Sequence, residues 1–444
     1  MSPRAALVVP KQVFALIDAS NFYVSCERVF RPSLNGRPVI SLSNNDGCAI
    51  ARSNEAKALG IKMGQPWHEV RHLEREAGLV ALSANFPLYG DMSNRMMSIA
   101  AGLGPTHETY SIDESFVGLD GVPGDLTARS HAMRNRILQW TGIPCGIGLG
   151  PTKTLAKLAN HIAKTAERKP GSYPENLALV CNLTTLPASD IDALFAATDV
   201  GEVWGVGRRL GQQLRDAGVQ TVLDLTRMSP SMVRDRWSVV LERTVRELQG
   251  DSCISLEEAP PAKQQIACTR SFGHPISGLP DLIEAISEFA SRAAEKLRRQ
   301  SSLASAIHVF AHTSPFRSGP RFAGSTVVPM IRPTADSRLL VQAAVRGVTQ
   351  IYKPGFELTK AGVMLLDLVP DTYSQGELNF EMPAERDRGS LMAAVDVLNS
   401  RFGRGAVHVA SAPGAGTGPY WTTRQERLTP QYTTKWSDLP VAHA

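Results

Sequence analysis

Apolar runs alternate along the chain with segments whose apolar positions recur every three or four residues. The continuous run over residues 13–17 is typical of a buried strand that ends at Asp18. Helical periodicity follows over 90–103 and 126–140, and a Gly-rich run over 143–150 predicts a strand leading into a helix over 155–164. This order predicts an α+β domain with a mixed or antiparallel sheet and helices on one face.

A small subdomain is predicted to interrupt this domain over residues 31–80. Its pattern indicates a strand over 37–42, a turn over 43–47, a second strand over 48–52 and a short helix over 54–59. Residues 165–185, rich in Pro, Gly, Asn and Thr, are typical of a connector, and residues 230–250 have a helical pattern.

A second α+β unit is predicted over residues 266–370, after a linker with acidic, proline-rich and Gln-rich stretches. Its pattern indicates a helix beginning at residue 280, strands over 304–313 and 326–330, a helix over 337–352 and a strand over 361–368. From residue 371 the chain is rich in Pro, Gly, Ser and Thr, a composition that leaves the order of this tail in doubt.

Two adjacent carboxylates, Asp113 and Glu114, lie between two short apolar runs that predict a hairpin. Neighbouring residues of a straight strand point to opposite faces, so both can serve one site only if the backbone bends there. With a third acid nearby, such as Asp18, they could hold one or two Mg²⁺ ions, which prefer oxygen ligands and phosphates. A charged hairpin tip in solvent, and an Asp that only caps a helix, are the alternatives.

Lysines follow the Gly-rich run at a helical spacing. Lys153, Lys157 and Lys164 fall on one face of the predicted helix. A Gly-rich turn that opens a lysine-bearing helix suits phosphate, although this one is not a Walker A loop. A solvated basic face explains the pattern equally well.

A Gly-x-Gly hairpin between predicted helices is typical of helix-hairpin-helix modules, whose backbone amides contact DNA phosphates without reading sequence. The candidate DNA-binding residues here are Gly205, Gly207, Arg208 and Arg209. An ordinary helical turn that stops at glycine is the alternative.

Composition adds little to this picture. The chain has 444 residues, of which 43% are apolar and 20% charged, with a formal net charge of +5, which weakly favours an anionic partner. We expect no signal peptide and no membrane segment, and the six scattered cysteines indicate neither a zinc site nor a disulfide framework. A cytoplasmic protein is expected.

Several ordered motifs together resemble one family. The segments LIDASNFYVSCE, SNNDGCAIARSNEAKALGIKMGQPW, DMSNRMMS, YSIDESF, GIGLGPTKTLAKLANHIAK and VWGVGRRL resemble the UmuC family, the catalytic subunits of bacterial DNA polymerase V within the Y family of translesion polymerases. The resemblance runs from about residue 13 to the C-terminus. It implies a multidomain right-hand α+β polymerase: a palm (1–30 and 80–165), fingers (31–80), a helical thumb (166–250), a little-finger DNA-binding domain (260–370) and a tail (371–444) for partners or the clamp.

The resemblance also implies roles for single residues. Asp18, Asp113 and Glu114 match catalytic metal-binding carboxylates for two Mg²⁺ ions, and the carbonyl of Ala19 is a further ligand. Tyr23 matches a steric gate that excludes ribonucleotides, with Phe22 as its neighbour. The other nucleotide-binding candidates implied are Arg52, Lys57 and Lys164.

The activity implied is error-prone translesion DNA synthesis in the SOS response, without proofreading. Primer-template DNA and dNTPs are the implied substrates, and a processed UmuD dimer, RecA and the sliding clamp are the implied partners. A clamp-binding peptide has its nearest match in Gln375, Leu378 and Phe380, with irregular spacing. A catalytically silent DNA-binding scaffold and a nucleotide cyclase are the competing hypotheses; the three acids argue against the former and the DNA-binding pattern against the latter.

Overall fold

The computed structural model describes residues 12–317, 319–372, 388–414 and 418–441. Their contacts divide the chain into two compact units. The first falls within residues 1–42, 48–260 and 427–444, and the second within 43–47 and 261–426. No helix in these four described ranges has the length and apolarity needed to cross a membrane.

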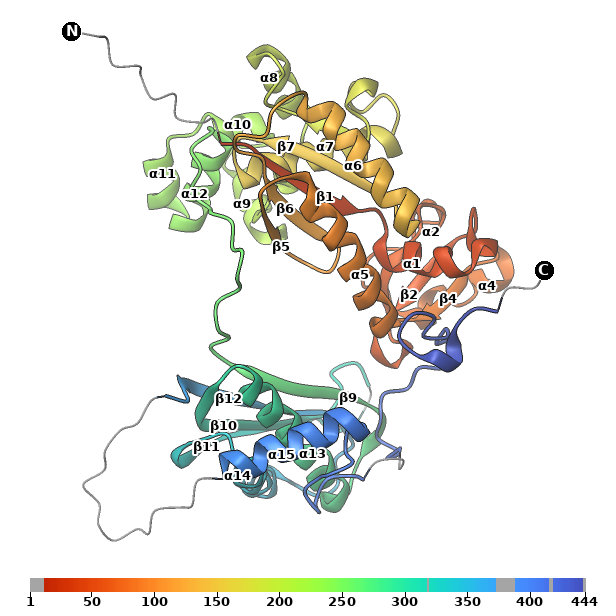
Figure 1. The fold of residues 1–444 in the computed structure, drawn as a ribbon, viewed down its shortest axis with the longest axis vertical. Helices are drawn as coiled ribbons and strands as arrows, with labels where there is room; N and C mark the ends of the chain where they lie inside the picture. Colours follow the sequence, from red (N-terminus) through yellow and green to blue (C-terminus); the bar gives the residue numbers. More distant parts are fainter. Residues whose placement is uncertain (1–11, 318, 373–387, 415–417, 442–444) are drawn as a thin grey trace. The chain divides into compact units, whose positions relative to one another are not determined.

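A five-stranded mixed sheet forms the centre of the first unit, in the order β5-β6-β1-β7-β8 (Figure 1). Neighbouring strands are antiparallel except β7 and β8, which are parallel. The strands are β1 (Phe14–Ala19), β5 (Thr106–Thr109), β6 (Glu114–Gly118), β7 (Cys145–Gly150) and β8 (Val180–Asn182). The sequence predicted no strand at β8, because its three residues lie in a segment with the composition of a connector.

Helices cover both faces of this sheet, so the expectation of helices on one face was wrong. One face carries Ala15 and Ile17 of β1 and packs against α1 (Phe22–Phe30), α5 (Phe86–Ala100) and α6 (Leu126–Thr141). The opposite face carries Phe14 and Leu16, and α7 (Lys153–Arg168) lies against it.

The glycines of β7 explain how α7 can lie so close to the sheet. A Cβ atom at Gly148 would stand 2.1 Å from the backbone nitrogen of Asn160, and one at Gly150 would stand 2.7 Å from that of Ala156. The alternate residues Cys145, Ile147 and Leu149 are buried on the other face. The Gly-rich run is therefore a packing surface for α7, and its glycines are accounted for without a phosphate.

Two further parts complete the first unit. A small sheet of order β3-β2-β4 is built from β2 (Val39–Leu42), β3 (Ala49–Arg52) and β4 (Val80–Ser83), with α2 (Asn54–Ala58), α3 (Trp67–Val70) and α4 (Leu73–Glu76). A helical part contains α8 (Ala188–Ala196), α9 (Arg208–Asp216), α10 (Val222–Thr226), α11 (Pro230–Arg236) and α12 (Val239–Leu248). Its core is shared with Leu155, Leu158 and Ile162 of α7, which therefore packs on two sides.

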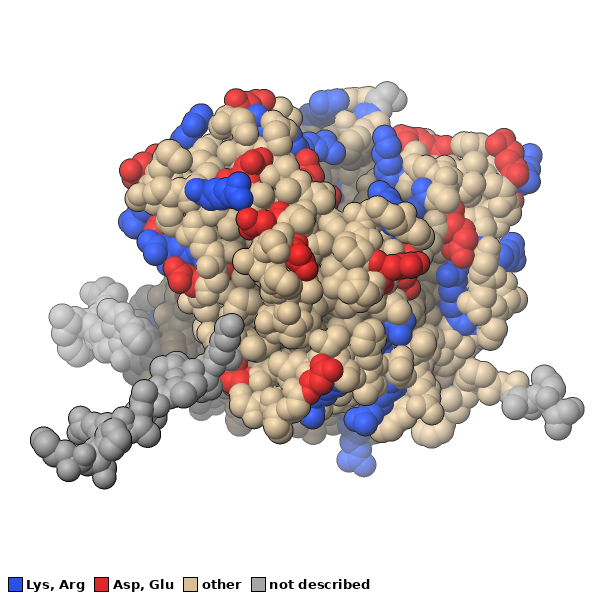
Figure 2. Space-filling model, turned by 90° about the horizontal axis from the view of Figure 1, so that it is seen from above, with Lys and Arg blue, Asp and Glu red and all other residues tan. Residues whose placement is uncertain are grey.

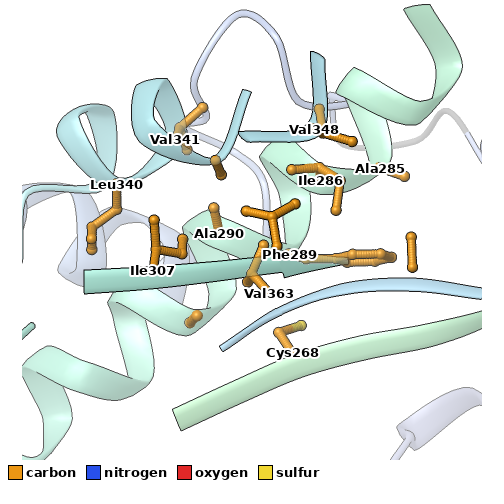
Figure 3. Close-up of a cluster of buried hydrophobic side chains, with 14 of the residues drawn as sticks. Cys268, Ala285, Ile286, Phe289, Ala290, Ile307, Leu340, Val341, Val348 and Val363 are labelled. Atoms are coloured by element: carbon orange, nitrogen blue, oxygen red, sulfur yellow. The ribbon is translucent and has the colours of Figure 1, made fainter. Parts of the chain in front are cut away.

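The second unit is a four-stranded antiparallel sheet of order β11-β10-β12-β9 with helices on one face. The strands are β9 (Ile266–Ile276), β10 (Ser302–His312), β11 (Ala323–Thr334) and β12 (Leu358–Pro370). Phe289 and Ala290 of α13 (Leu279–Arg299) and Val341 of α14 (Ser337–Ile351) meet Ile307 and Val363 of the sheet in the core that Figure 3 shows. The sequence did not predict β9, whose 11 residues include Gly, His and Pro.

The segment after residue 371 contains structure that its composition did not predict. Helix α15 (Gly389–Phe402) belongs to the second unit, where Asp396 accepts two hydrogen bonds of 2.7 Å from the guanidinium of Arg298. Residues 427–441 belong to the first unit. These two parts are therefore ordered, although the composition had left the order of this segment in doubt.

Candidate active site

Strand pairing brings Asp18 opposite Glu114. Asp18 of β1 and Glu114 of β6 are register partners, and the amide of Ala19 donates to the carbonyl of Asp113 over 2.9 Å. The chain bends between β5 and β6, where the Oγ of Ser111 donates to Asp113 Oδ1 over 2.7 Å and accepts from the amide of Glu114 over 3.1 Å. The bend that the sequence required is present, and it brings the two acids to the end of β1.

The three lysines of α7 face three carboxylates of the sheet. Lys153 Nζ lies 2.6 Å from Glu108, Lys157 Nζ lies 3.0 Å from Glu114, and Lys164 Nζ lies 2.6 Å from Asp18. The Lys153–Glu108 pair is buried, with side-chain exposures of 3% and 8%, and the other two pairs are largely buried. This helix face is thus not a solvated basic surface; it supplies one counter-charge to each acid.

The environment of Asp18 favours its neutral form. Burial, opposed by Lys164 and aided by the charges of Glu114 and Asp113, raises the pKa of Asp18 to about 6. Lys164 Nζ also donates to the carbonyl of Ala19 over 3.0 Å, so one ammonium satisfies two oxygens at the end of β1.

A cavity of about 330 Å³ opens beside Asp18 and Asp113. It brings together most residues that the resemblance assigned to metal or nucleotide binding. Its lining includes Asp18, Ala19, Phe22, Tyr23, Arg52, Lys57, Asp113 and Lys164. Glu114 does not line it, but it is joined to Asp18 through the strand register.

Two basic residues of the small-sheet part, Arg52 of β3 and Lys57 of α2, line this cavity. Lys57 Nζ donates to Asn21 Oδ1 over 2.5 Å, and burial, together with Arg168, Arg52 and Lys164, lowers the pKa of Lys57 to about 8. Arg52 donates to the carbonyl of Ile61 over 2.7 Å, and among the described residues its Nε finds no hydrogen-bond partner. Asn21 adopts a left-handed conformation (φ 51°) that allows α1 to begin directly after β1.

Aromatic rings hold Tyr23 at the cavity wall. Its ring stacks on that of Tyr89 with centroids 4.5 Å apart and an interplanar angle of 12°, and Phe86 meets it edge-on at 6.0 Å. Phe22 is only 3% exposed and packs in the hydrophobic core beside the sheet, so it is a core residue. No sequence pattern indicated Tyr89, because it lies 66 residues after Tyr23 and only the fold brings the two rings together.

The Gly-x-Gly hairpin lies apart from the cavity. Gly205 (φ 88°), Gly207, Arg208 and Arg209 are exposed where α9 begins. The adjacent Trp204, however, contacts Lys157, the partner of Glu114: its ring lies 5.1 Å from Lys157 Nζ, which is also 4.4 Å from the ring of Tyr110. Sequence reasoning missed this contact, because nothing in the local pattern joins Trp204 to Lys157.

The acids at the end of β1 are candidate ligands for a divalent ion. Within the described ranges, no three His, Cys, Asp or Glu side chains are grouped so that they could hold a metal ion. Lysine ammoniums lie on Asp18 and Glu114 instead. The carboxylates and the Ala19 carbonyl are nevertheless the hard oxygen donors that Mg²⁺ prefers. The residue types therefore suit the ion, whereas in this arrangement Lys157 and Lys164 occupy the carboxylates of Glu114 and Asp18.

One face of the molecule shows no segregation of charge by sign (Figure 2). On the face that Figure 2 shows, Lys and Arg are interspersed with Asp and Glu. The clamp-binding candidates Gln375, Leu378 and Phe380 lie outside the described residues.

Comparison with family models places the chain. The impB/mucB/samB family model matches residues 17–161, the C-terminal domain of the same family matches 263–378, and a domain of unknown function matches 389–442. The chain is 44% identical over 433 residues to protein ImpB of Salmonella typhimurium, covering 97% of this chain and 99% of that protein. The chain belongs to the impB/mucB/samB family.

Other members of this family align equally completely. Protein UmuC of Salmonella typhimurium strain LT2 is 42% identical over 433 residues, covering 96% of this chain and 99% of that protein. Protein MucB of Escherichia coli is 40% identical over 435 residues, covering 97% and 99%. The protein is thus a UmuC-type, Y-family DNA polymerase, as its motifs suggested.

A solved structure agrees with this family's fold. A Y-family DNA polymerase chimera of Dbh and Dpo4 matches with a TM-score of 0.61 at 17% identity, covering 81% of this chain and 99% of that one. In this chain Ser115, which follows the acidic pair, is buried and donates to the carbonyl of Glu108 over 3.1 Å. Its hydroxyl therefore adds a hydrogen bond between neighbouring strands of the sheet.

Proposed function

We propose that this protein performs error-prone translesion DNA synthesis in the SOS response, adding dNTPs to a primer 3′-OH with two Mg²⁺ ions. The observation that carries the proposal is the cavity beside Asp18. The cavity has a volume of about 330 Å³ and is lined by acids, by the cations Arg52, Lys57 and Lys164, and by the aromatic ring of Tyr23. These are the groups that metal, triphosphate and sugar require, in one place.

The proposed division of labour follows from the contacts. Asp18, Asp113, Glu114 and the carbonyl of Ala19 would hold Mg²⁺. Bound Mg²⁺ would supply two effects: activation of the 3′-OH, and neutralisation of charge on the triphosphate and the leaving pyrophosphate. Three side chains would bind the triphosphate: Lys164 after leaving Asp18, together with Lys57 and Arg52.

The wall of the cavity would select the sugar. The ring of Tyr23 would lie against C2′ of the incoming nucleotide, where a ribose 2′-OH would collide with it. Because Tyr23 is stacked on Tyr89, the ring cannot retreat without breaking that contact. Phe22 would support the site from the core.

Low fidelity follows from the size of the proposed fingers, residues 31–80. Its sheet has three short strands, too little structure to close a lid over a nascent base pair. An open site selects weakly by shape and tolerates damaged templates.

The remaining assignments are part of the same proposal. Residues 1–30 and 80–165 would be the palm, 166–250 the thumb and 260–370 the little finger. DNA phosphates would contact Gly205, Gly207, Arg208 and Arg209, whose exposure supports this role. We further propose a cytoplasmic enzyme whose partners are a processed UmuD dimer, RecA and the sliding clamp, the last through Gln375, Leu378 and Phe380.

Primer extension across an abasic template tests the proposal. Wild type, Asp113→Ala and the exposed control Glu167→Ala would be compared with Mg²⁺ and dNTPs, with and without a UmuD-like partner and a RecA filament. We expect extension by wild type and the control and none by Asp113→Ala. DNA binding without extension by wild type under every condition would overturn the enzyme assignment and favour a DNA-binding scaffold.

A further inference from the structure

The last described segment of the chain is built into the first unit. We call residues 427–432 the C-terminal strap. Arg427 exchanges hydrogen bonds with Ser83 at the end of β4: its amide donates to Ser83 Oγ over 3.0 Å, and its carbonyl accepts from the amide of Ser83 over 3.1 Å. In Figure 1 the strap is the dark blue segment beside α1 and β4.

Side chains fix the strap at both ends. The guanidinium of Arg427 lies 2.6 Å from Glu74 and 4.9 Å from the ring centre of Trp67. Five residues later, the ring of Tyr432 stacks on that of Phe30 in α1, with centroids 4.8 Å apart and 7° between the planes. The strap therefore joins the small-sheet side of the unit to the helix that follows Asp18.

Between these ends, Thr429 is buried and fully hydrogen-bonded. Its hydroxyl donates to Glu27 Oε1 over 3.0 Å and accepts from Asn85 Nδ2 over 3.1 Å. Asn85 Nδ2 also lies 3.1 Å from the Thr429 carbonyl and 3.0 Å from that of Pro430. Asn85 is wholly buried and caps the first turn of α5, so the strap bonds to the residue that starts this helix.

The same carboxylate holds the ring beneath Tyr23. Tyr89 Oη donates to Glu27 Oε1 over 2.8 Å, and the Tyr89 ring stacks on Tyr23. Glu27 is wholly buried on α1, and its burial raises the pKa of its carboxyl group. A chain of contacts thus runs from Thr429 through Glu27 and Tyr89 to Tyr23.

We infer that the C-terminal strap positions the Tyr23 ring, so that discrimination against ribonucleotides depends on Thr429, about 400 residues away in sequence. This inference rests on the proposed function, in which Tyr23 contacts the sugar. Loss of the Thr429 hydroxyl leaves the buried Glu27 carboxylate short of a donor, whereas Asn85 Nδ2 keeps the carbonyls of Thr429 and Pro430. Glu27 then shifts to regain a hydrogen bond, and the support of Tyr89 under Tyr23 loosens.

Thr429 acts through other residues and is thus a positioning residue. The alternative is that the strap only stabilises the fold, which would lower activity toward every nucleotide alike. A change in the ratio between two sugars separates these cases, because a lower amount of folded enzyme affects both sugars equally.

The experiment measures kcat/KM for a dNTP and the matching rNTP opposite an undamaged template base. Thr429→Val removes the hydroxyl at nearly constant shape, and Thr429→Ser restores it. Thr434→Val is the control on an exposed residue of the same segment. Tyr89→Phe removes the hydrogen bond to Glu27 without touching the strap, and Tyr23→Ala removes the ring itself.

We expect Thr429→Val and Tyr89→Phe to raise the rNTP:dNTP ratio of kcat/KM about threefold to tenfold, as loss of one buried hydrogen bond allows. Thr429→Ser and Thr434→Val should keep the wild-type ratio, and Tyr23→Ala should raise it most. If Thr429→Val proves too unstable to assay, the rNTP:dNTP ratios of Tyr89→Phe and Thr429→Ser, compared with wild type, still test the chain of contacts from Thr429 to Tyr23.

Each contrary result has a distinct meaning. A wild-type ratio in both Thr429→Val and Tyr89→Phe, with Tyr23→Ala relaxed, overturns the inference and leaves the polymerase function intact. An equal fall for both nucleotides in Thr429→Val also overturns it, in favour of a strap that only stabilises. Absence of dNTP incorporation by wild type overturns the proposed function itself.

Discussion

The ammonium of Lys164 lies 2.6 Å from the carboxylate of Asp18. In the proposed reaction this pair must separate, because Asp18 is needed for Mg²⁺ and Lys164 for the triphosphate. The lysine therefore serves as a counter-charge that stabilises the carboxylates before substrate and metal arrive. Ion and nucleotide binding become coupled through one side chain.

Removing that ammonium should strengthen metal binding while weakening nucleotide binding. For Lys164→Met we expect affinity for Mn²⁺, measured by titration calorimetry without nucleotide, to rise about threefold to tenfold, because the pair is only partly exposed. The KM for dNTP should rise about tenfold with the loss of a charged phosphate contact. Lys169→Met, on an exposed lysine of the same helix end, is the control. Unchanged Mn²⁺ affinity in Lys164→Met would contradict the coupling.

Trp204 should matter for turnover as well as for folding. Its ring and that of Tyr110 enclose Lys157, which is paired with Glu114. Because such cation–π contacts contribute roughly 0.5–2 kcal/mol, Trp204→Leu should lower single-turnover rates about threefold to tenfold. The affinity for dNTP should change little, because Trp204 does not line the cavity.

Trp140→Leu is the matched control for this prediction. Trp140 is 67% exposed and lies near Arg136 on α6. Equal rates in the two variants, measured by rapid quench at saturating dNTP, would show that Trp204 does not hold Lys157 in place.

The pH dependence of nucleotide capture should report on Lys57. Its pKa is lowered to about 8, mainly by burial and then by Arg168 and Arg52, so the free enzyme loses this positive charge as the pH rises through about 8. We expect kcat/KM for dNTP to fall above that pH. Lys57→Arg keeps its charge throughout and should flatten the alkaline limb, since kcat/KM reports the pKa values of the free enzyme. Parallel profiles for wild type and variant would exclude Lys57 as the titrating group.

Two glycine substitutions should have opposite effects on stability. At Gly148, a Cβ would meet the backbone of α7, 2.1 Å from the nitrogen of Asn160, so Gly148→Ala should lower the free energy of unfolding by roughly 3 kcal/mol. Gly90 lies within α5, where an added methyl group would have open space within 4 Å, and Gly90→Ala should raise the free energy of unfolding by about 0.5–1 kcal/mol. Urea denaturation measures both. A neutral Gly148→Ala would mean that α7 can move away from the sheet at little cost.

Local sequence patterns determined most of the regular elements. The continuous apolar run of β1, the amphipathic patterns of α7 and α13, and the polar break between β5 and β6 are encoded in neighbouring residues, so each could be predicted. The acids at 18, 113 and 114 and the lysines at 157 and 164 could also be named as candidates from their residue types and motif context.

Only tertiary structure decided how these residues are paired. Nothing local assigns Lys153 to Glu108 or Lys157 to Glu114, since each partner comes from a different strand. Strand β8 forms because β7 offers a free edge, and it has too few residues for a pattern of its own.

The glycines and the strap illustrate the same limit. From the sequence, the glycines of β7 suggested a phosphate-binding turn. In the structure they allow α7 to pack closely on the sheet. Thr429 could not be linked to Glu27 by any sequence period, because their contact depends on the chain's return across about 400 residues. Periodicity reports what one element buries, whereas hydrogen bonds between distant elements are decided only when those elements pack together.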